Sequence, residues 1–250
     1  MRKTEASAPA VSSPLTLRTR ESLKLNIGCG RALKEGFVNC DLTAGEGVDF
    51  AFDCQKKWPF TSESVARIES DHTLEHLTDP MAFFREAWRV LIPNGQIQVR
   101  LPYGWHQSSW WDLTHVRPWL QESFAILQPG FTAYTRNYQH EKMGFAFWVA
   151  NVCLVLERPW ARMWRFRPLR PLVSRAGRHL LNVYRDLLME AYKTTEDDSR
   201  SAAFGGNRHP AEVPCSVGVY EHEYYGKSPE KLDFHKLLVF TTNKDVEGNG

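Results

Sequence analysis

The chain lacks several features that would place it in a class at once. Its 250 residues contain five cysteines and no C-x-x-C pair, so nothing supports a disulfide framework or a cysteine-based zinc module. An odd set of cysteines without close pairs favours a reducing compartment. No stretch reaches the roughly 20 apolar residues that a membrane-spanning helix needs. We therefore expect a cytoplasmic protein.

A strong excess of one charge is missing as well. The net charge is +2, which argues against a surface built as a whole for nucleic acid. Residues 1–20 lack the apolar core of a secretory signal, and we expect a disordered lead there. Aromatic residues, in contrast, are abundant. Nine Trp and fourteen Phe predict aromatic-rich packing or an aromatic-lined cleft.

From residue 23 onward, short apolar runs alternate with loops and helix-like segments, which is the pattern of a parallel α/β sheet. Asp79 and Pro80 predict the start of the clearest helix, which has an apolar stripe and ends at Pro93-Asn94-Gly95. A second helix is predicted at 118–127. The predicted strands are 23–27, 37–41, 48–53, 65–70 and 96–101, and the stripe consists of Met81, Phe84, Trp88 and Leu91.

The C-terminal half of the chain has a different predicted pattern of helices and strands. Residues 131–200 are predicted to be largely helical, and 217–225 and 235–242 to be two strands of a hairpin. We expect an α/β fold with a Rossmann-like, doubly wound, mostly parallel sheet, a C-terminal antiparallel hairpin and a helical insertion. The predicted units are a lead (1–20), a binding core (21–130), a helical basic-aromatic insertion or cap (131–216) and the C-terminal strands (217–250).

One connection is unusually short. About seven residues separate Gly30 from the next predicted strand, whereas a parallel crossover usually takes about a dozen or more. Either the crossover is a shortened turn, or the two strands are not adjacent and parallel. We favour the shortened turn, because Gly36 gives the chain a place to reverse.

A glycine pair follows the first predicted strand, and an acid ends the second. Gly28 and Gly30 would let the backbone approach a ligand closely, and Asp41 could accept both hydroxyls of a ribose. Alone, Gly-x-Gly is a weak signal that also fits a simple tight turn. A dinucleotide site does not fit, because the third glycine of its motif would fall at Leu33 and the acid comes too early.

Further motifs follow in order: Asp53 before Trp58-Pro59-Phe60, the run 71–77, and the run 89–97 that leads into the fifth predicted strand. With Gly28-Cys29-Gly30, this series resembles the class I S-adenosylmethionine-dependent methyltransferases, in the type 11-like group with a Gly-Cys-Gly first motif. The resemblance covers about residues 23–128. It implies S-adenosyl-L-methionine as the cofactor, bound at the carboxyl edge of the strands.

The resemblance also implies roles for single residues. Gly28, Cys29 and Gly30 would pass beneath the methionine and ribose parts of the cofactor, and Asp41 would bind the ribose hydroxyls. The family usually has an acid where this chain has Asn26, so the contact of Asn26 with the cofactor's amino group would be weaker or mediated by water.

Three further positions follow from the same resemblance. Asp53 and Cys54 would face the adenine, and His72 would lie near the transferred methyl group. His72 and His76 are four residues apart, a spacing that on a helix would suggest a metal site. Since they fall in a loop-to-helix transition, and the resemblance implies a local structural role for the second histidine, we predict no metal.

The loop after the fifth predicted strand is placed where such folds contact their substrates. A general base is needed only for a weakly acidic hydroxyl or a protonated amine. His115 or His106 could serve, with Asp112 orienting the ring. Alternatively, Asp112 and His115 only tie down the loop.

Residues 143–180 join an apolar run, 143–156, to a segment rich in Arg, Trp and Phe. One interpretation is a helical cap with a solvated basic face. The other is an interfacial segment that docks on anionic lipid.

The main functional hypothesis is methyl transfer to an O or N atom of a small-molecule or glycan-type acceptor. The alternatives are a methyltransferase-like binding or scaffold protein without turnover, and a protein or RNA methyltransferase.

Overall fold

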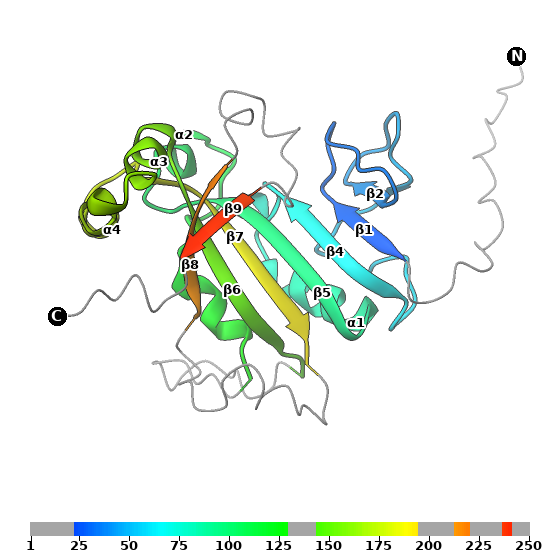
Figure 1. Ribbon diagram of the computed structural model, residues 1–250. Helices are drawn as coiled ribbons and strands as arrows, with labels where there is room; N and C mark the ends of the chain where they lie inside the picture. Colours follow the sequence, from blue (N-terminus) through cyan, green and yellow to red (C-terminus); the bar gives the residue numbers. More distant parts are fainter. Residues whose placement is uncertain (1–22, 130–143, 195–212, 221–236, 242–250) are drawn as a thin grey trace, which may run out of the picture.

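The computed structural model describes residues 23–129, 144–194, 213–220 and 237–241. The strands within these ranges form one mixed sheet of nine strands (Figure 1). The predicted lead, 1–20, lies outside the described residues. The strands are β1 (Lys24–Ile27), β2 (Val38–Asp41), β3 (Phe50–Ala51), β4 (Val65–Asp71), β5 (Leu91–Pro102), β6 (Phe147–Leu156), β7 (Tyr184–Lys193), β8 (Cys215–Tyr220) and β9 (Leu237–Thr241).

The strand order is β3-β2-β1-β4-β5-β7-β6-β8-β9. Strands β1 to β5 are parallel, β7 is antiparallel to both of its neighbours, β8 runs parallel to β6, and β9 pairs with β8 in the antiparallel direction. The predicted Rossmann-like, mostly parallel sheet with a C-terminal hairpin is therefore confirmed. Its order reverses between β1 and β4, the place where open α/β sheets bind ligands.

The short crossover also behaves as predicted. β1 and β2 are adjacent and parallel, with Ile27 opposite Cys40, and residues 28–37 join them without a helix. Gly36 takes a φ of +78°, which lets the chain reverse there. Asn26 secures the turn, because its Nδ2 donates to the carbonyl of Ala32 and to Oδ1 of Asn39, each at 2.9 Å.

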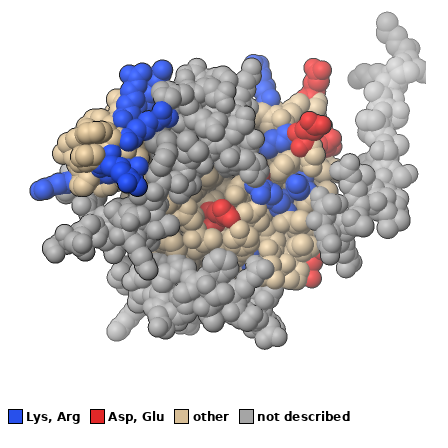
Figure 2. All heavy atoms as spheres, in the orientation of Figure 1, with Lys and Arg blue, Asp and Glu red and all other residues tan. Residues whose placement is uncertain are grey.

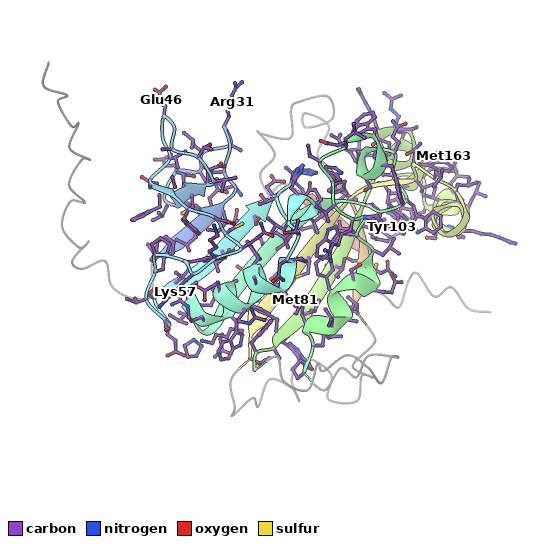
Figure 3. All side chains as sticks on the ribbon, turned by 180° about the vertical axis from the view of Figure 1, so that it is seen from behind. Arg31, Glu46, Lys57, Met81, Tyr103 and Met163 are labelled. Carbon is purple, nitrogen blue, oxygen red and sulfur yellow. The ribbon has the colours of Figure 1, made fainter. Side chains whose placement is uncertain are left out.

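Helix α1 (Pro80–Val90) packs on one face of the sheet (Figures 1 and 3). It begins as the sequence predicts, since Oδ1 of Asp79 accepts a hydrogen bond from the Ala82 N–H. The buried face differs from the predicted stripe, which shares only Phe84 with it. Met81 and Trp88 lie at the half-buried margin, and Leu91 already belongs to β5; the buried residues are Pro80, Phe83, Phe84, Ala87 and Val90.

The opposite face of the sheet carries a polar network. The Arg67 guanidinium donates to Glu69 at 2.6 Å, to Gln96 at 2.6 Å and to Gln98 at 2.7 Å. Gln96 in turn donates to Glu190 of β7 at 2.7 Å. The network therefore joins β4, β5 and β7 through side chains as well as through the backbone.

The prediction that 131–200 is largely helical is wrong where the structure has two ten-residue strands, β6 and β7, in place of helix. Residues 147–156 of the apolar run form β6, which lies between β7 and β8 inside the sheet. A short apolar run fits a buried strand as well as a buried helix, and only its neighbours in space decide between them. The strand predicted at 48–53 is only two residues long, and 118–127 contains a 3₁₀ helix, η2 (Gln121–Leu127).

A helical insertion is confirmed between β6 and β7. It consists of α3 (Arg158–Trp164), the 3₁₀ helix η4 (Arg167–Leu169) and α4 (Arg170–His179). Lys and Arg side chains gather over these helices in Figure 2. No helix of the described residues is long and apolar enough to cross a membrane.

Candidate functional site

A cavity of about 310 Å³ opens where the strand order reverses, at the carboxyl ends of β1, β2 and β4. Figure 3 shows the loops after β1 and β2 at this end, with Arg31 and Glu46 pointing away from the sheet at their tips. The cavity lies at the lower end of the range of about 300–1,000 Å³ that small-molecule sites occupy. Its walls are Ile27, Gly28, Gly30, Cys40, Asp41, Leu42, Phe52, Asp53, Cys54, Gln55, His72, Thr73, His76 and Leu77.

The glycine turn forms one wall and needs glycine for two different reasons. Gly28 has a φ of +71°, and a Cβ placed there would overlap Oγ1 of Thr73. Gly30 has a φ of +49°, and a Cβ there would have no neighbour within 4 Å. The N–H groups of Gly28 and Cys29 both donate to the Cys40 carbonyl, at 2.8 and 3.0 Å, which holds the turn against β2.

Asp41 ends β2 and lines the same cavity. Its Oδ2 accepts from the Gly30 N–H at 2.7 Å, and its Oδ1 accepts from the Leu42 N–H at 2.8 Å. Because each carboxylate oxygen can accept more than one hydrogen bond, both oxygens keep acceptor capacity for a ligand. Asp41 thus ties the glycine turn to β2 and still presents a carboxylate to the cavity.

Asp53 and Cys54 form another part of the wall. A hydrogen bond from the Gln55 N–H lowers the pKa of Asp53, so its carboxylate is ionised at neutral pH. Burial raises the pKa of the Cys54 thiol to about 12. Cys54 is therefore a neutral wall group rather than a nucleophile.

His72 lies just beyond β4 in a dense set of acids. Its Nδ1 is 3.1 Å from Oε1 of Glu75, and its Nε2 lies 3.7 Å from Asp71 and 3.9 Å from Asp186. Burial by itself lowers the pKa of His72, but the hydrogen bond to Glu75 and the charges of Asp71 and Asp186 outweigh it and raise that pKa. The surrounding acids thus stabilise the protonated form of His72 relative to that of an isolated imidazole.

The structure brings together six of the eight residues assigned to the cofactor from sequence: Gly28, Gly30, Asp41, Asp53, Cys54 and His72. Asn26 and Cys29 do not line the cavity. Asn26 is buried and bonded within the crossover, and the Cys29 side chain is buried in the turn. Thr73 and Gln55 also line the cavity and were not predicted. Their positions could have indicated them, because each directly follows a residue that the sequence assigned to the cofactor, His72 and Cys54.

The three candidate catalytic residues do not form one group: His115 and Asp112 lie together, and His106 lies apart from them, beside Glu157. Nε2 of His115 lies 3.8 Å from Oδ2 of Asp112, as the sequence suggested. Nε2 of His106 lies 3.5 Å from Oε2 of Glu157, at the end of β6. No sequence motif joins His106 to Glu157, which lies 51 residues further along the chain. The His106 hydrogen bond lowers the pKa of Glu157.

His106 belongs to the wall of a second cavity, of about 410 Å³, formed by the loop after β5. The surroundings are largely aromatic and apolar, and Trp105 and Trp110 are more than half exposed. Its walls are Gly104, Trp105, His106, Gln107, Trp110, Pro118, Leu120, Leu181 and Asn182. Since β4 and β5 are neighbours, both cavities lie along the same edge of the sheet.

Residues 34–99 match a family model described as a methyltransferase domain. The matched segment runs from the loop before β2 into β5, about a quarter of the chain. It includes Asp41, Asp53, Cys54 and His72 but not the Gly-Cys-Gly turn. The match supports the resemblance to class I S-adenosylmethionine-dependent methyltransferases. No curated protein matches the chain.

Several solved structures are similar to the chain at low identity. One is a complex of the Trm112 methyltransferase activator from Haloferax volcanii with a methyltransferase (15% identity, 70% of this chain, 84% of that chain, TM-score 0.43). Another is a SAM-dependent methyltransferase from Archaeoglobus fulgidus (16%, 68%, 85%, TM-score 0.44). A third is YcgJ from Bacillus subtilis (14%, 70%, 93%, TM-score 0.44). Similarity at this level does not identify a substrate.

Proposed function

We propose that the chain is an S-adenosylmethionine-dependent methyltransferase that binds its cofactor in the cavity at the end of β1, β2 and β4. One observation carries the proposal. Six residues that the sequence assigns to this cofactor, from four separate segments of the chain, line a single cavity at the switch point of the sheet. The methyltransferase-domain match over 34–99 supports it.

The walls suit the cofactor chemically. The Asp41 carboxylate at the tip of β2 would accept the two ribose hydroxyls, while its bond to the Gly30 N–H fixes its orientation. Phe52 and Leu77 supply apolar surface for a purine, beside the ionised Asp53 that would accept from an exocyclic amine. Gly30 leaves space for the part of the ligand that passes over the turn, since a Cβ there would have no neighbour within 4 Å, whereas Gly28 makes room for the Thr73 side chain.

When bound, the cofactor supplies a methyl group activated by a positively charged sulfur. The work left to the protein is to hold the acceptor in line with that methyl group and to exclude competing water. The residues of 104–118 would do this, since they follow β5 beside the cavity. Their aromatic side chains would contact a small-molecule or glycan-type acceptor through its apolar faces.

An acceptor hydroxyl or ammonium group also has to lose a proton. His106 is one candidate base: it lines the second cavity, its Nδ1 accepts from the Ser108 N–H at 3.2 Å, and its Nε2 faces the ionised Glu157, which would stabilise the imidazolium. His115 with Asp112 is the other pair. Replacing His106 with Gln should lower kcat with little change in the KM for the cofactor.

Turnover is the direct test. The purified chain would be incubated with S-adenosylmethionine and panels of hydroxyl, amine and saccharide acceptors, and S-adenosylhomocysteine release would be measured. We expect acceptor-dependent release that the Asp41→Asn variant strongly reduces. Cofactor binding without turnover on any panel would favour a binding or scaffold protein instead. Asn26 motivates this alternative, because it stands where the family usually has an acid and its side chain is hydrogen-bonded within the crossover. A protein or RNA panel would test the remaining class of acceptor.

The insertion between β6 and β7 suggests where such an enzyme would act. The insertion carries exposed arginines, which gather in Figure 2, and it also has the exposed Phe166 and Leu172, a composition that suits peripheral contact of a cytoplasmic protein with anionic lipid. Trp164 is buried and takes no part. Flotation with anionic vesicles at low salt should recover the chain, and absence of binding there would remove this part of the proposal. The exposed arginines are Arg158, Arg162, Arg165, Arg167 and Arg175.

A further inference from the structure

A second group of polar side chains lies at the edge of the cofactor cavity. Glu75 and His76 come from the 3₁₀ helix η1 (Leu74–His76) after β4, and His115 comes from the loop after α2 (Ser108–Trp111). One potential ligand atom from each lies within 4.8 Å of the other two. The Val116 N–H donates to the Glu75 carbonyl at 2.8 Å, which holds the two segments together.

Glu75 is the member of this group that requires an explanation. Its side chain is 2% exposed, and its Oε1 is 3.1 Å from Nδ1 of His72. Its Oε2 is also buried and has no hydrogen-bond partner among the residues that the structure describes. A buried acceptor left unpaired costs about 1–3 kcal/mol, and more when it is charged. The unpaired oxygen thus points to a ligand that the side chains themselves do not supply.

Both imidazoles are oriented by hydrogen bonds on their Nδ1 side. Nδ1 of His115 lies 3.3 Å from the Ser109 carbonyl, which can only accept, so the proton is on Nδ1. Nδ1 of His76 lies 2.9 Å from Oγ1 of Thr114, whose own hydrogen goes to Oδ1 of Asp112 at 2.7 Å. Thr114 must therefore accept from His76. Each ring is left with an unprotonated Nε2.

Two such nitrogens and a carboxylate oxygen are a known ligand set for zinc, and metal-bound histidines usually donate their other N–H to a fixed acceptor. We propose that Glu75, His76 and His115 form a binding site for a divalent transition metal, with zinc as the reference ion. At bond lengths of about 2.1 Å, tetrahedral ligand atoms lie roughly 3.4 Å apart, which small side-chain rotations can reach. His76 is exposed, which leaves an entry path for the ion.

The site has three protein ligands and so keeps an open coordination position. His76 also lines the cavity proposed for the cofactor, so the open position would lie at the edge of that cavity. Resting on the proposed function, we assign the open position to an acceptor oxygen, which the ion would orient and polarise. His115 is then occupied as a ligand, and His106 remains the histidine available as a base.

The test is a zinc titration of the untagged, EDTA-stripped full chain without any cofactor, followed calorimetrically and by metal analysis after dialysis. We expect one equivalent bound. His76→Ala and His115→Ala should each weaken binding by at least about 100-fold, and Thr114→Val by about 10-fold through loss of the fixed tautomer. His106→Ala is the matched control outside the cluster and should bind zinc as the wild type does.

Cobalt gives a second readout, since its visible absorption reports ligand geometry, and circular dichroism confirms that each variant is folded. Absence of stoichiometric zinc and cobalt binding by the folded wild type would overturn the proposal, as would binding unchanged in both His76→Ala and His115→Ala. A parallel titration with S-adenosylhomocysteine separates this result from the proposed function, because the metal-free chain should still bind that nucleoside.

Discussion

At the scale of single residues, the glycine turn is constrained by one neighbour, Thr73. Gly28 and Gly30 both have positive φ, so alanine is strained at either position, by about 1–2 kcal/mol. Only at Gly28 would the added Cβ also collide, with the Thr73 side chain. The pair therefore separates backbone strain from steric overlap within one turn.

Gly28→Ala should destabilise the chain by more than Gly30→Ala does, measured as the free energy of unfolding in urea. Adding Thr73→Ala removes the two closest atoms and should recover much of the excess in the Gly28→Ala background but nothing in the Gly30→Ala background. Equal effects of the two single substitutions would show that Thr73 does not pack against Gly28.

Glu86 links α1 to the segment before β4, and its charge makes that link depend on pH. Burial alone would raise the pKa of Glu86, but hydrogen bonds from Arg89 and from the Trp58 N–H outweigh it and lower that pKa below 4.5. A carboxyl with a lowered pKa in the folded state adds stability above its unfolded pKa and loses it as the pH falls through the folded value.

Glu86→Gln should therefore be less stable than the wild type at pH 7, and the difference should shrink below about pH 4.5 as the wild-type carboxyl becomes protonated. Chemical denaturation at several pH values measures it. Glu46→Gln, at an exposed loop tip (Figure 3), is the control and should show little difference at any pH. A difference independent of pH would mean that the Glu86 charge is not what stabilises this link.

At the scale of elements, a polar network joins β4, β5 and β7 on the face of the sheet opposite α1. Arg67 is the donor that joins Glu69, Gln96 and Gln98, and the Glu69 side chain is only 4% exposed. Removing one partner from a buried ionic network leaves the other charge undercompensated.

Arg67→Met keeps the apolar stem and removes the charge, and it should cost about 2–4 kcal/mol of unfolding free energy. The exposed Arg31 supplies the comparison, since Arg31→Met should stay within about 0.5 kcal/mol of the wild type. A similarly small effect of Arg67→Met would mean that Lys34, which also pairs with Glu69 at 2.6 Å, is enough to compensate the Glu69 charge.

The elements differ in how far the sequence predicts them. The start of α1 is encoded locally, by the Asp79 cap and Pro80, and was predicted correctly. The run that forms β6 has no comparable start signal in the sequence. It forms a strand because it pairs with β7, which begins 28 residues after β6 ends. Two strands that become neighbours only through an intervening helical insertion have no local signal of their pairing.

At the scale of the whole molecule, the sheet determines which residues meet. The family resemblance assigned Asp41, Asp53 and His72 to one site, and they meet there because they lie at the carboxyl ends of parallel strands, which share an edge of the sheet. The contacts of His76 with His115 and of His106 with Glu157 could not be predicted in this way. They join loops whose paths are set by packing, and no spacing in the sequence reports them.

The central claim is that the cavity at the switch point holds S-adenosylmethionine, and calorimetric titration with S-adenosylhomocysteine tests it most directly. We predict one site of micromolar affinity, which Asp41→Asn weakens by about 10- to 100-fold through loss of a charged acceptor. Glu46→Ala, in the loop after β2, should bind as the wild type does. A folded wild-type chain that binds neither S-adenosylhomocysteine nor S-adenosylmethionine, or an Asp41→Asn variant with unchanged affinity, would contradict the account.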